Sequence, residues 1–127
     1  MKNLLITGGS GFIGSHLCLI LLRNNYSLYV LDSFINSSPE ALNRVKKLAQ
    51  FDKKNIENNL KVFVGDMREK KSIENVFRFA FQNNESIDGV IHLASLKSVK
   101  ESIEKPLDYW ENNIISTLNL VEIMIKY

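Results

Sequence analysis

The chain has 127 residues and a formal net charge of +2, with 45% hydrophobic and 24% charged residues. These values are typical of a globular protein and argue against a disordered chain or a nucleic-acid partner. The single cysteine, Cys18, excludes an internal disulfide framework and a cysteine-based zinc site, and we expect no metal. No apolar run reaches the about 20 residues needed to cross a bilayer, so no membrane contact is expected. Residues 4–6 are too short for a signal-peptide core, which favours a cytoplasmic location.

Strand-like apolar runs alternate with helix-like apolar stripes along the chain. Strands are expected at residues 3–7, 28–31, 60–64 and 89–93. Helices are expected from Phe12 to about residues 23–25, where asparagine can take a left-handed cap, then from Pro39, over residues 73–81, and from Pro106. Residues 53–59 are expected to form a solvated loop, and a polar loop follows the fourth strand.

This alternation predicts an α/β fold, a Rossmann-like doubly wound parallel sheet of about four βα units with strand order 3-2-1-4. Four units are about two thirds of a full dinucleotide-binding fold. We therefore expect the fold of residues 1–127 to be incomplete. The fourth strand would then have an exposed edge, which favours marginal stability or self-association. The last helix carries two apolar sides, Trp110, Ile114, Leu118, Val121 and Ile125 on one and Ile115, Ile123 and Met124 on another.

A glycine-rich turn connects the first strand to the first helix, with the sequence Thr7-Gly8-Gly9-Ser10-Gly11-Phe12-Ile13-Gly14. Gly8 allows a tight turn, Gly11 lets the backbone approach a pyrophosphate, and Gly14 lets the helix pack closely on the strand. The helix N-terminus then presents free N–H groups to the phosphates. Such turns also have purely structural uses. Here the strand, the helix and an acidic residue about 20 positions later favour dinucleotide binding.

Asp32, at the end of the second strand, indicates which dinucleotide is bound. Its carboxylate can accept hydrogen bonds from both adenosine ribose hydroxyls, whereas a 2′-phosphate would bring negative charges together with no arginine nearby. The expected cofactor is therefore NAD. The alternative is an aspartate that only caps the following turn.

Residues 7–16, Thr-Gly-Gly-Ser-Gly-Phe-Ile-Gly-Ser-His, resemble the extended short-chain dehydrogenase/reductase superfamily. Three further segments narrow this resemblance to the UDP-glucose 4-epimerases, and they lie at residues 31–42, 64–68 and 90–113. The resemblance covers essentially the whole chain. Two departures are Ser95, where the family usually has glycine, and Lys100, where a small residue is common.

The resemblance implies which residues hold the cofactor. Phe12 and Ile13 would approach the pyrophosphate, residues 32–37 would surround the adenosine ribose, and Asp66 and Met67 would border the adenine. Residues 93–97 and Asn112 would lie beside the nicotinamide half and the phosphates. Lys97 follows a strand end beside the crevice and would supply a point charge for phosphate, its alternative being a solvated loop lysine. The expected cofactor-binding residues are Gly8, Gly11, Phe12, Ile13, Gly14, Asp32, Ser33, Phe34, Asn36, Ser37, Asp66, Met67, Leu93, Ala94, Ser95, Lys97 and Asn112.

The resemblance also implies an activity, the interconversion of UDP-galactose and UDP-glucose through a 4-keto sugar, with NAD carrying the hydride. The family's catalytic tyrosine lies in a Tyr-x-x-x-Lys motif, and none of Tyr26, Tyr29 and Tyr109 has a lysine four residues later. We therefore expect no catalytic residue in this chain, which alone would be inactive; His16 and His92 fall where the family uses them structurally. The resemblance implies that residues 1–127 are a truncated N-terminal NAD-binding (Rossmann) domain, with the substrate domain absent. In the full-length protein a UDP-sugar substrate and a homodimer are expected. Two alternatives stay open: another NAD-dependent nucleotide-sugar epimerase, dehydratase or decarboxylase, and a non-enzymatic NAD-binding remnant.

Overall fold

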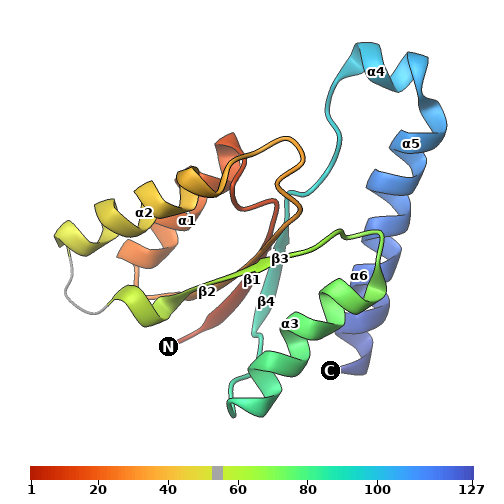
Figure 1. Ribbon diagram of the computed structural model, residues 1–127. Helices are drawn as coiled ribbons and strands as arrows, with labels where there is room; N and C mark the ends of the chain where they lie inside the picture. The colour runs from red at the N-terminus through yellow and green to blue at the C-terminus, as the bar shows by residue number, and fades with distance from the viewer. Residues whose placement is uncertain (53–55) are drawn as a thin grey trace.

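A four-stranded parallel sheet forms the centre of the protein in a computed structural model, which describes residues 1–52 and 56–127 (Figure 1). The strand order is β3-β2-β1-β4, so the predicted doubly wound order 3-2-1-4 is confirmed. The predicted strand positions agree with the structure to within about one residue at each end. The strands are β1 (Asn3–Thr7), β2 (Ser27–Asp32), β3 (Leu60–Val64) and β4 (Gly89–His92).

Helices cover both faces of this sheet, with α1 (Phe12–Arg23) and α2 (Pro39–Asp52) on one face and α3 (Lys70–Gln82) and α6 (Ser116–Lys126) on the other (Figure 1). Side chains of a strand point alternately to its two faces. Accordingly Leu5 packs toward α3 and α6, while Ile6 packs toward α1 and α2. The whole of β2 is buried, because neighbouring strands pair with both of its edges and helices cover both of its faces.

The first helix begins and ends as its sequence predicts. It starts at Phe12, directly after the glycine turn, and its N-cap residue Gly11 offers no side chain to the free N–H groups of the first turn. It is followed by Asn25, which has a φ of 65°, so the left-handed asparagine expected near residues 23–25 is present. A helix with uncapped N–H groups at its start is suited to an anionic ligand.

Three segments differ from the sequence prediction. Within the expected loop 53–59, Ile56–Asn59 forms a 3-10 turn (η1), and residues 53–55 lie outside the described residues. The expected polar loop after β4 contains a short helix, α4 (Val99–Glu104), which Ser98 caps by accepting a hydrogen bond from the Glu101 amide. Serine caps of this kind are hard to distinguish from turns in a polar sequence.

The expected single helix from Pro106 is divided into three parts. It consists of α5 (Pro106–Trp110), a π-helical turn η2 (Glu111–Ile115) and α6. A π-turn inserts one residue into the helical repeat and so rotates the side chains that follow it. A prediction based on a period of 3.6 residues cannot show this shift. Among the described residues, no helix is both long enough and apolar enough to span a membrane.

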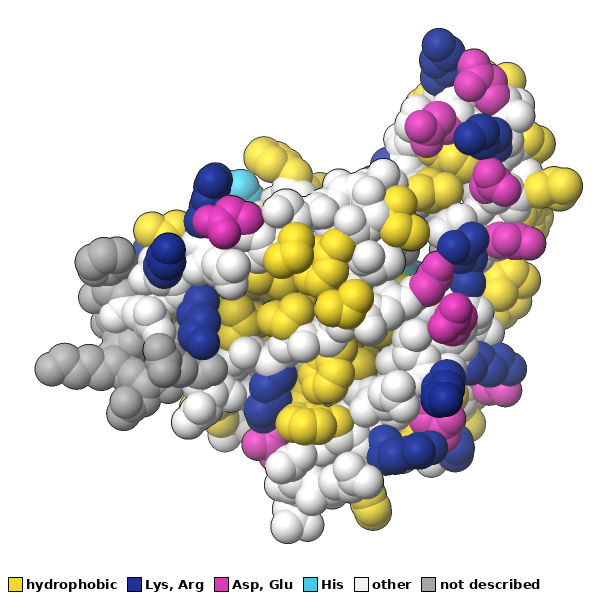
Figure 2. Space-filling view, viewed as in Figure 1, with side chains coloured by type: hydrophobic (Ala, Val, Ile, Leu, Met, Phe, Trp, Pro, Cys, Tyr) yellow, Lys and Arg dark blue, Asp and Glu magenta, His cyan; other side chains and the backbone are white. Residues whose placement is uncertain are grey.

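The face that α6 turns toward the sheet is not its most apolar one. Leu120 and Ile123 are buried there, together with the polar residues Ser116 and Asn119. The longer apolar stripe predicted on this helix, including Leu118 and Ile125, is exposed on the outside. Figure 2 shows apolar side chains along the right-hand edge, where α5 and α6 run, and also over the middle of this face. The predicted stripe that includes Leu118 and Ile125 is therefore an uncovered apolar surface.

Candidate functional site

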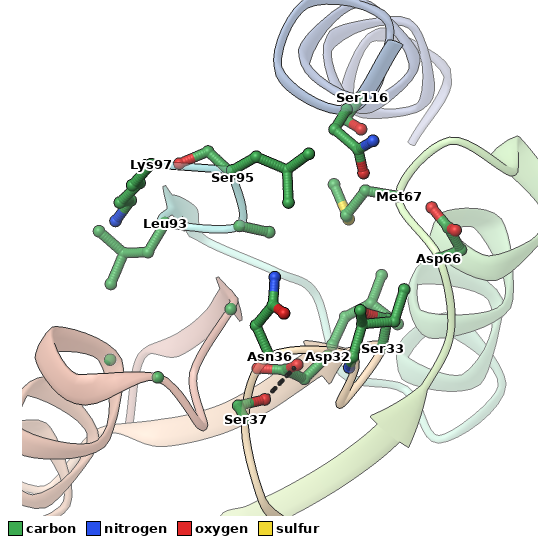
Figure 3. A pocket seen from close by; sticks show the side chains of 18 of the residues that line it. Asp32, Ser33, Asn36, Ser37, Asp66, Met67, Leu93, Ser95, Lys97 and Ser116 are labelled. Carbon is green, nitrogen blue, oxygen red and sulfur yellow. Dashed lines mark hydrogen bonds between the residues drawn. The ribbon is translucent and has the colours of Figure 1, made fainter. Parts of the chain in front are cut away.

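A crevice of about 420 Å³ lies where the chain leaves the carboxyl ends of the strands, which is where parallel α/β sheets bind ligands. Figure 3 shows the crevice from close by, with Lys97 and Asp66 on opposite sides of it. The sequence-predicted residues come from five separate segments. Those that line the crevice are Gly8, Gly11, Phe12, Ile13, Gly14, Asp32, Ser33, Asn36, Ser37, Asp66, Met67, Leu93, Ala94, Ser95, Lys97 and Asn112.

The glycine turn brings the chain close to two neighbouring segments. Gly8 has a φ of 68°, and a Cβ there would lie 2.7 Å from the amide nitrogen of Ala94. A Cβ on Gly14 would overlap the carbonyl oxygen of Gly8. Only residues without a Cβ allow β1, α1 and the segment after β4 to approach so closely. The result is that the uncapped start of α1 faces the crevice.

The Asp32 carboxylate is almost completely buried, with 7% exposure, and accepts four hydrogen bonds. Oδ2 accepts from the amide (3.0 Å) and hydroxyl (2.5 Å) of Ser10, and Oδ1 accepts from the Phe34 amide (2.9 Å) and the Ser37 hydroxyl (3.0 Å). Donors on both oxygens fix the orientation of the carboxylate. The carboxylate is therefore held at the wall of the crevice by groups on both sides.

Cys18 lies behind the glycine turn, where its thiol is 3.9 Å from the carbonyl oxygen of Gly9. Burial, and to a lesser extent the negative charge of Asp32, raises the pKa of this thiol to about 12. A thiol with such a pKa is neutral and unreactive near pH 7. Cys18 accordingly acts as a core residue.

Asp66 and Met67 form the wall opposite Lys97. Asp66 pairs with Arg68 through both carboxylate oxygens, and the hydrogen bond from that guanidinium lowers the pKa of Asp66. The Asn119 side chain donates to the carbonyl oxygens of Met67 (3.2 Å) and Arg68 (2.9 Å). A buried polar residue on α6 thus fixes the course of the segment that follows β3.

The segment from Leu93 to Lys97 forms another side of the crevice. Hydrogen bonds from side chains of other elements to its main-chain groups hold it in place. The Asn113 side chain accepts a hydrogen bond from the Leu96 amide (2.8 Å) and donates one to the Leu96 carbonyl oxygen (2.9 Å). The Ala94 amide donates to the Thr7 hydroxyl (3.2 Å). These contacts leave the side chains of Ser95 and Lys97 exposed at the crevice.

Phe34 is the one predicted residue that does not line the crevice. Its φ is 56°, and its side chain packs against the apolar cluster between the sheet and helices α1 and α2. The crevice also includes residues that the sequence patterns did not single out, namely Leu31, Ile35, Gly65, Leu96 and Ser116. Four of them adjoin or fall within predicted segments. Ser116 is four positions after Asn112, so helical spacing was a usable signal for it.

Comparison with known proteins places the chain in a family. The sequence model described as GDP-mannose 4,6 dehydratase matches residues 5–127. The chain belongs to this family. It is 44% identical over 126 residues to UDP-glucose 4-epimerase 2 of Arabidopsis thaliana, covering 99% of this chain and 33% of that protein. It is also 44% identical over 124 residues to the UDP-glucose 4-epimerase of Bacillus subtilis, covering 98% of this chain and 33% of that protein.

Solved structures of family members agree with these sequence relatives. The UDP-glucose 4-epimerase of Bifidobacterium longum, crystallised with NAD+ and UDP, superposes with a TM-score of 0.83 and 38% identity, covering 98% of this chain and 34% of that one. The UDP-glucose 4-epimerase of Thermus thermophilus, crystallised with NAD, gives a TM-score of 0.79 and 32% identity, covering 99% of this chain and 34% of that one. The resemblance to UDP-glucose 4-epimerases is thus confirmed. The chain spans about a third of the length of these relatives.

Proposed function

We propose that residues 1–127 form an NAD-binding domain that corresponds to the N-terminal third of a UDP-glucose 4-epimerase. The observation that carries this proposal is the crevice. An uncapped helix start, a fixed carboxylate at the end of β2 and the Leu93–Lys97 segment border one cavity, as a dinucleotide requires. The similarity to epimerases that were crystallised with NAD supports the same assignment.

The crevice offers a suitable group for each part of NAD. The first N–H groups of α1, at Phe12 to Gly14, would bind the pyrophosphate, and Lys97 would add a positive charge. At the adenosine ribose, the Asp32 carboxylate would accept hydrogen bonds from the ribose hydroxyls, and the Ser37 hydroxyl could donate or accept. The Asp66–Met67 segment would border the adenine, with the Leu93–Lys97 segment and Asn112 on the nicotinamide side. When bound, NAD+ supplies a hydride acceptor, and the chain's own residues orient it.

Asp32 favours NAD over NADP. Its carboxylate already has a negative charge in a poorly solvated position, so a 2′-phosphate beside it would be repelled. The donors from Ser10, Phe34 and Ser37 prevent the carboxylate from turning away. The specificity therefore depends on a rigid group, which strengthens the discrimination.

Calorimetric titration of the chain with NAD+ and NADP+ tests the proposal. We expect saturable NAD+ binding and affinity for NADP+ lower by at least tenfold, equivalent to about 1.4 kcal/mol. Circular dichroism melting in parallel establishes that the sample is folded. A folded chain that binds neither nucleotide, or that prefers NADP+, would contradict the assignment.

The parent activity that we propose is the interconversion of UDP-galactose and UDP-glucose, with a UDP-sugar as substrate. These 127 residues contain no Tyr-x-x-x-Lys sequence, so we propose that they do not catalyse it on their own. A chimaera in which this chain replaces the matching third of the Bacillus subtilis epimerase should convert UDP-galactose, whereas the isolated chain should not. Turnover by the isolated chain would refute the second statement.

The family description favours one alternative, a dehydratase acting on a nucleotide sugar. A chimaera that folds and binds NAD+ but does not epimerise would favour it. We also propose that the exposed apolar side of α6 is an interface in the longer protein, as the homodimer implied by the resemblance requires.

A further inference from the structure

His92 connects the glycine turn to the helix on the other side of the crevice. It is the last residue of β4 and pairs with Thr7, the last residue of β1. Its Nδ1 lies 2.5 Å from the Thr7 hydroxyl, and its Nε2 lies 3.2 Å from the Thr117 hydroxyl at the start of α6. The imidazole therefore bridges two hydroxyl groups that come from distant parts of the chain.

Counting donors and acceptors fixes the protons of this bridge. The Thr7 hydroxyl accepts hydrogen bonds from the amides of Leu93 and Ala94, both at 3.2 Å, and the Leu93 amide also donates to the Thr7 carbonyl oxygen. Among the described contacts, the one acceptor for the Thr7 hydroxyl proton is Nδ1 of His92. Nδ1 must then be unprotonated, and in a neutral imidazole the ring proton is on Nε2.

The far end of the bridge fits the same arrangement. The Thr117 hydroxyl donates to the carbonyl oxygen of Asn113 (2.8 Å), so it has a lone pair free to accept from Nε2 of His92. Asn113 in turn holds both main-chain groups of Leu96. The hydroxyl groups of Thr7 and Thr117 thus each donate one hydrogen bond and use their lone pairs as acceptors. Every proton between Ala94 and Leu96 has one acceptor in this network.

The π-turn places these groups. Asn113 lies within η2, and Thr117 follows it by four residues. Asn112 and Ser116 line the crevice from the same part of the helix. A movement of the helix relative to β4 would therefore shift both Asn112 and the Leu93–Lys97 segment. The His92 bridge opposes such a movement, because it connects the helix to the ends of β1 and β4.

We propose that His92, in its neutral form with the proton on Nε2, is a positioning residue that fixes the Leu93–Lys97 segment against the glycine turn. Its bridge between Thr7 and Thr117 couples both ends of that segment to the helix that carries Asn112 and Asn113. The effect on cofactor affinity rests on the NAD site proposed above. The bridge itself can be measured without any cofactor.

Nitrogen-15 NMR of the unmodified chain tests the proton assignment. The chain contains two histidines, and the second, His16, is exposed on α1 and serves as an internal comparison. We expect the long-range spectrum of His92 at pH 7.5 to show a single Nε2–H tautomer. A Nδ1–H tautomer, or a mixture like that of a free imidazole, would overturn the proposal.

A matched pair of variants tests the positioning role. Thr117 is exposed, so Thr117→Val should fold while removing the acceptor for Nε2, and Thr117→Ser should retain it. We expect Thr117→Val to speed hydrogen exchange at the Ala94 and Leu96 amides by about three- to tenfold, in line with the loss of one hydrogen bond. Thr117→Ser should exchange like the unmodified chain. Amides at the centre of β2 should exchange alike in all three proteins.

Titration with NAD+ then connects the bridge to the site. The dissociation constant should rise by about three- to tenfold in Thr117→Val and should be restored in Thr117→Ser. Unchanged amide exchange in Thr117→Val, or exchange that rises equally in β2, would overturn the positioning role. Absence of NAD+ binding in the unmodified chain would instead refute the NAD site, while the NMR and exchange results would still decide whether the bridge exists.

Discussion

Ser10 donates two hydrogen bonds to the same oxygen of Asp32, from its amide at 3.0 Å and from its hydroxyl at 2.5 Å. The two residues belong to different βα units, since Ser10 lies in the glycine turn after β1 and Asp32 ends β2. Their contact joins the part of the crevice suited to phosphates to the part suited to the ribose. A change at either residue should therefore affect the other.

A double-mutant cycle on Ser10 and Asp32 measures this dependence. Asp32→Asn should weaken NAD+ binding by tenfold or more, since hydrogen bonds to a charged group contribute about 1.5–3 kcal/mol. Ser10→Ala should weaken it by less, because the Ser10 amide still donates. The double variant should lose less than the sum of the two effects, because the residues interact directly.

The cofactor preference gives the same cycle a second readout. Asp32→Asn should reduce the preference for NAD+ over NADP+, since it removes the charge that repels a 2′-phosphate. Asp88→Asn is a suitable control, because Asp88 is exposed and accepts a hydrogen bond from the Asn3 amide outside the crevice. Two results would contradict the role assigned to the carboxylate. One is strictly additive losses of NAD+ binding energy in the double variant, and the other is a preference for NAD+ over NADP+ that Asp32→Asn leaves unchanged.

Alanine substitutions at Gly14 and Gly11 should have different effects, the first on the stability of the fold and the second on NAD+ binding. Gly14→Ala should lower the free energy of unfolding by about 1–3 kcal/mol, because its Cβ would overlap the Gly8 carbonyl oxygen in a packed region. Gly11→Ala should leave the melting temperature nearly unchanged, since its Cβ would meet only the Gly8 carbonyl oxygen at 3.4 Å. It should nevertheless weaken NAD+ binding by narrowing the approach to the phosphates. Equal effects of both variants on melting, or unchanged NAD+ binding by Gly11→Ala, would contradict these separate roles.

The stability of the fold should fall as the solution is acidified through the range in which histidine titrates. Burial lowers the pKa of His92 below its ordinary value of 6.5, so the unfolded chain binds this proton more readily than the folded chain. The contribution of His92 is therefore complete above pH 6.5 and is lost as the pH falls through its folded pKa. Its ring partners, Thr7 and Thr117, are uncharged hydroxyls.

Urea unfolding at pH 5.0 and pH 7.5 measures that pH dependence. His92→Asn keeps an acceptor near the position of Nδ1 but cannot be protonated, so it should reduce the stability difference between the two pH values. If His92→Asn has no effect on the pH dependence, another group is responsible for it.

The outer side of α6 should promote self-association. Leu118 and Ile125 are 58% and 82% exposed, and they belong to the stripe predicted from the sequence. Glutamate at both positions should lower the sedimentation coefficient at high protein concentration without lowering the melting temperature. Leu120→Ala, on the buried side of the same helix, should instead cost about 2–5 kcal/mol of stability. Unchanged sedimentation of the glutamate variant would show that this side does not associate.

The positions of the strands and of most crevice residues could be predicted from the sequence, because short-range rules apply to them. The apolar runs of β1 and β3 set their boundaries, and a glycine or an aspartate ends or follows β1, β2 and β3 at one edge of the sheet. Parallel strands bring those ends together, so local patterns alone predict that the glycine turn at Gly8 and the carboxylate of Asp32 border one crevice. The resemblance to the epimerase family added Asp66, Met67, residues 93–97 and Asn112. For Lys97, its place after a strand end beside the crevice was a second signal.

The tertiary structure decided the features that depend on packing between distant segments. The last helix is interrupted by the π-turn at Glu111–Ile115, and a helical period cannot reveal such an insertion. The side chain of Phe34, whose φ is 56°, packs against the apolar cluster and does not line the crevice. The His92 bridge exists because β1, β4 and α6 meet at one point, although Thr7 and Thr117 are far apart in the sequence. Sequence patterns determine which residues end each strand, whereas side-chain hydrogen bonds between elements depend on angles and distances that only the packed fold sets.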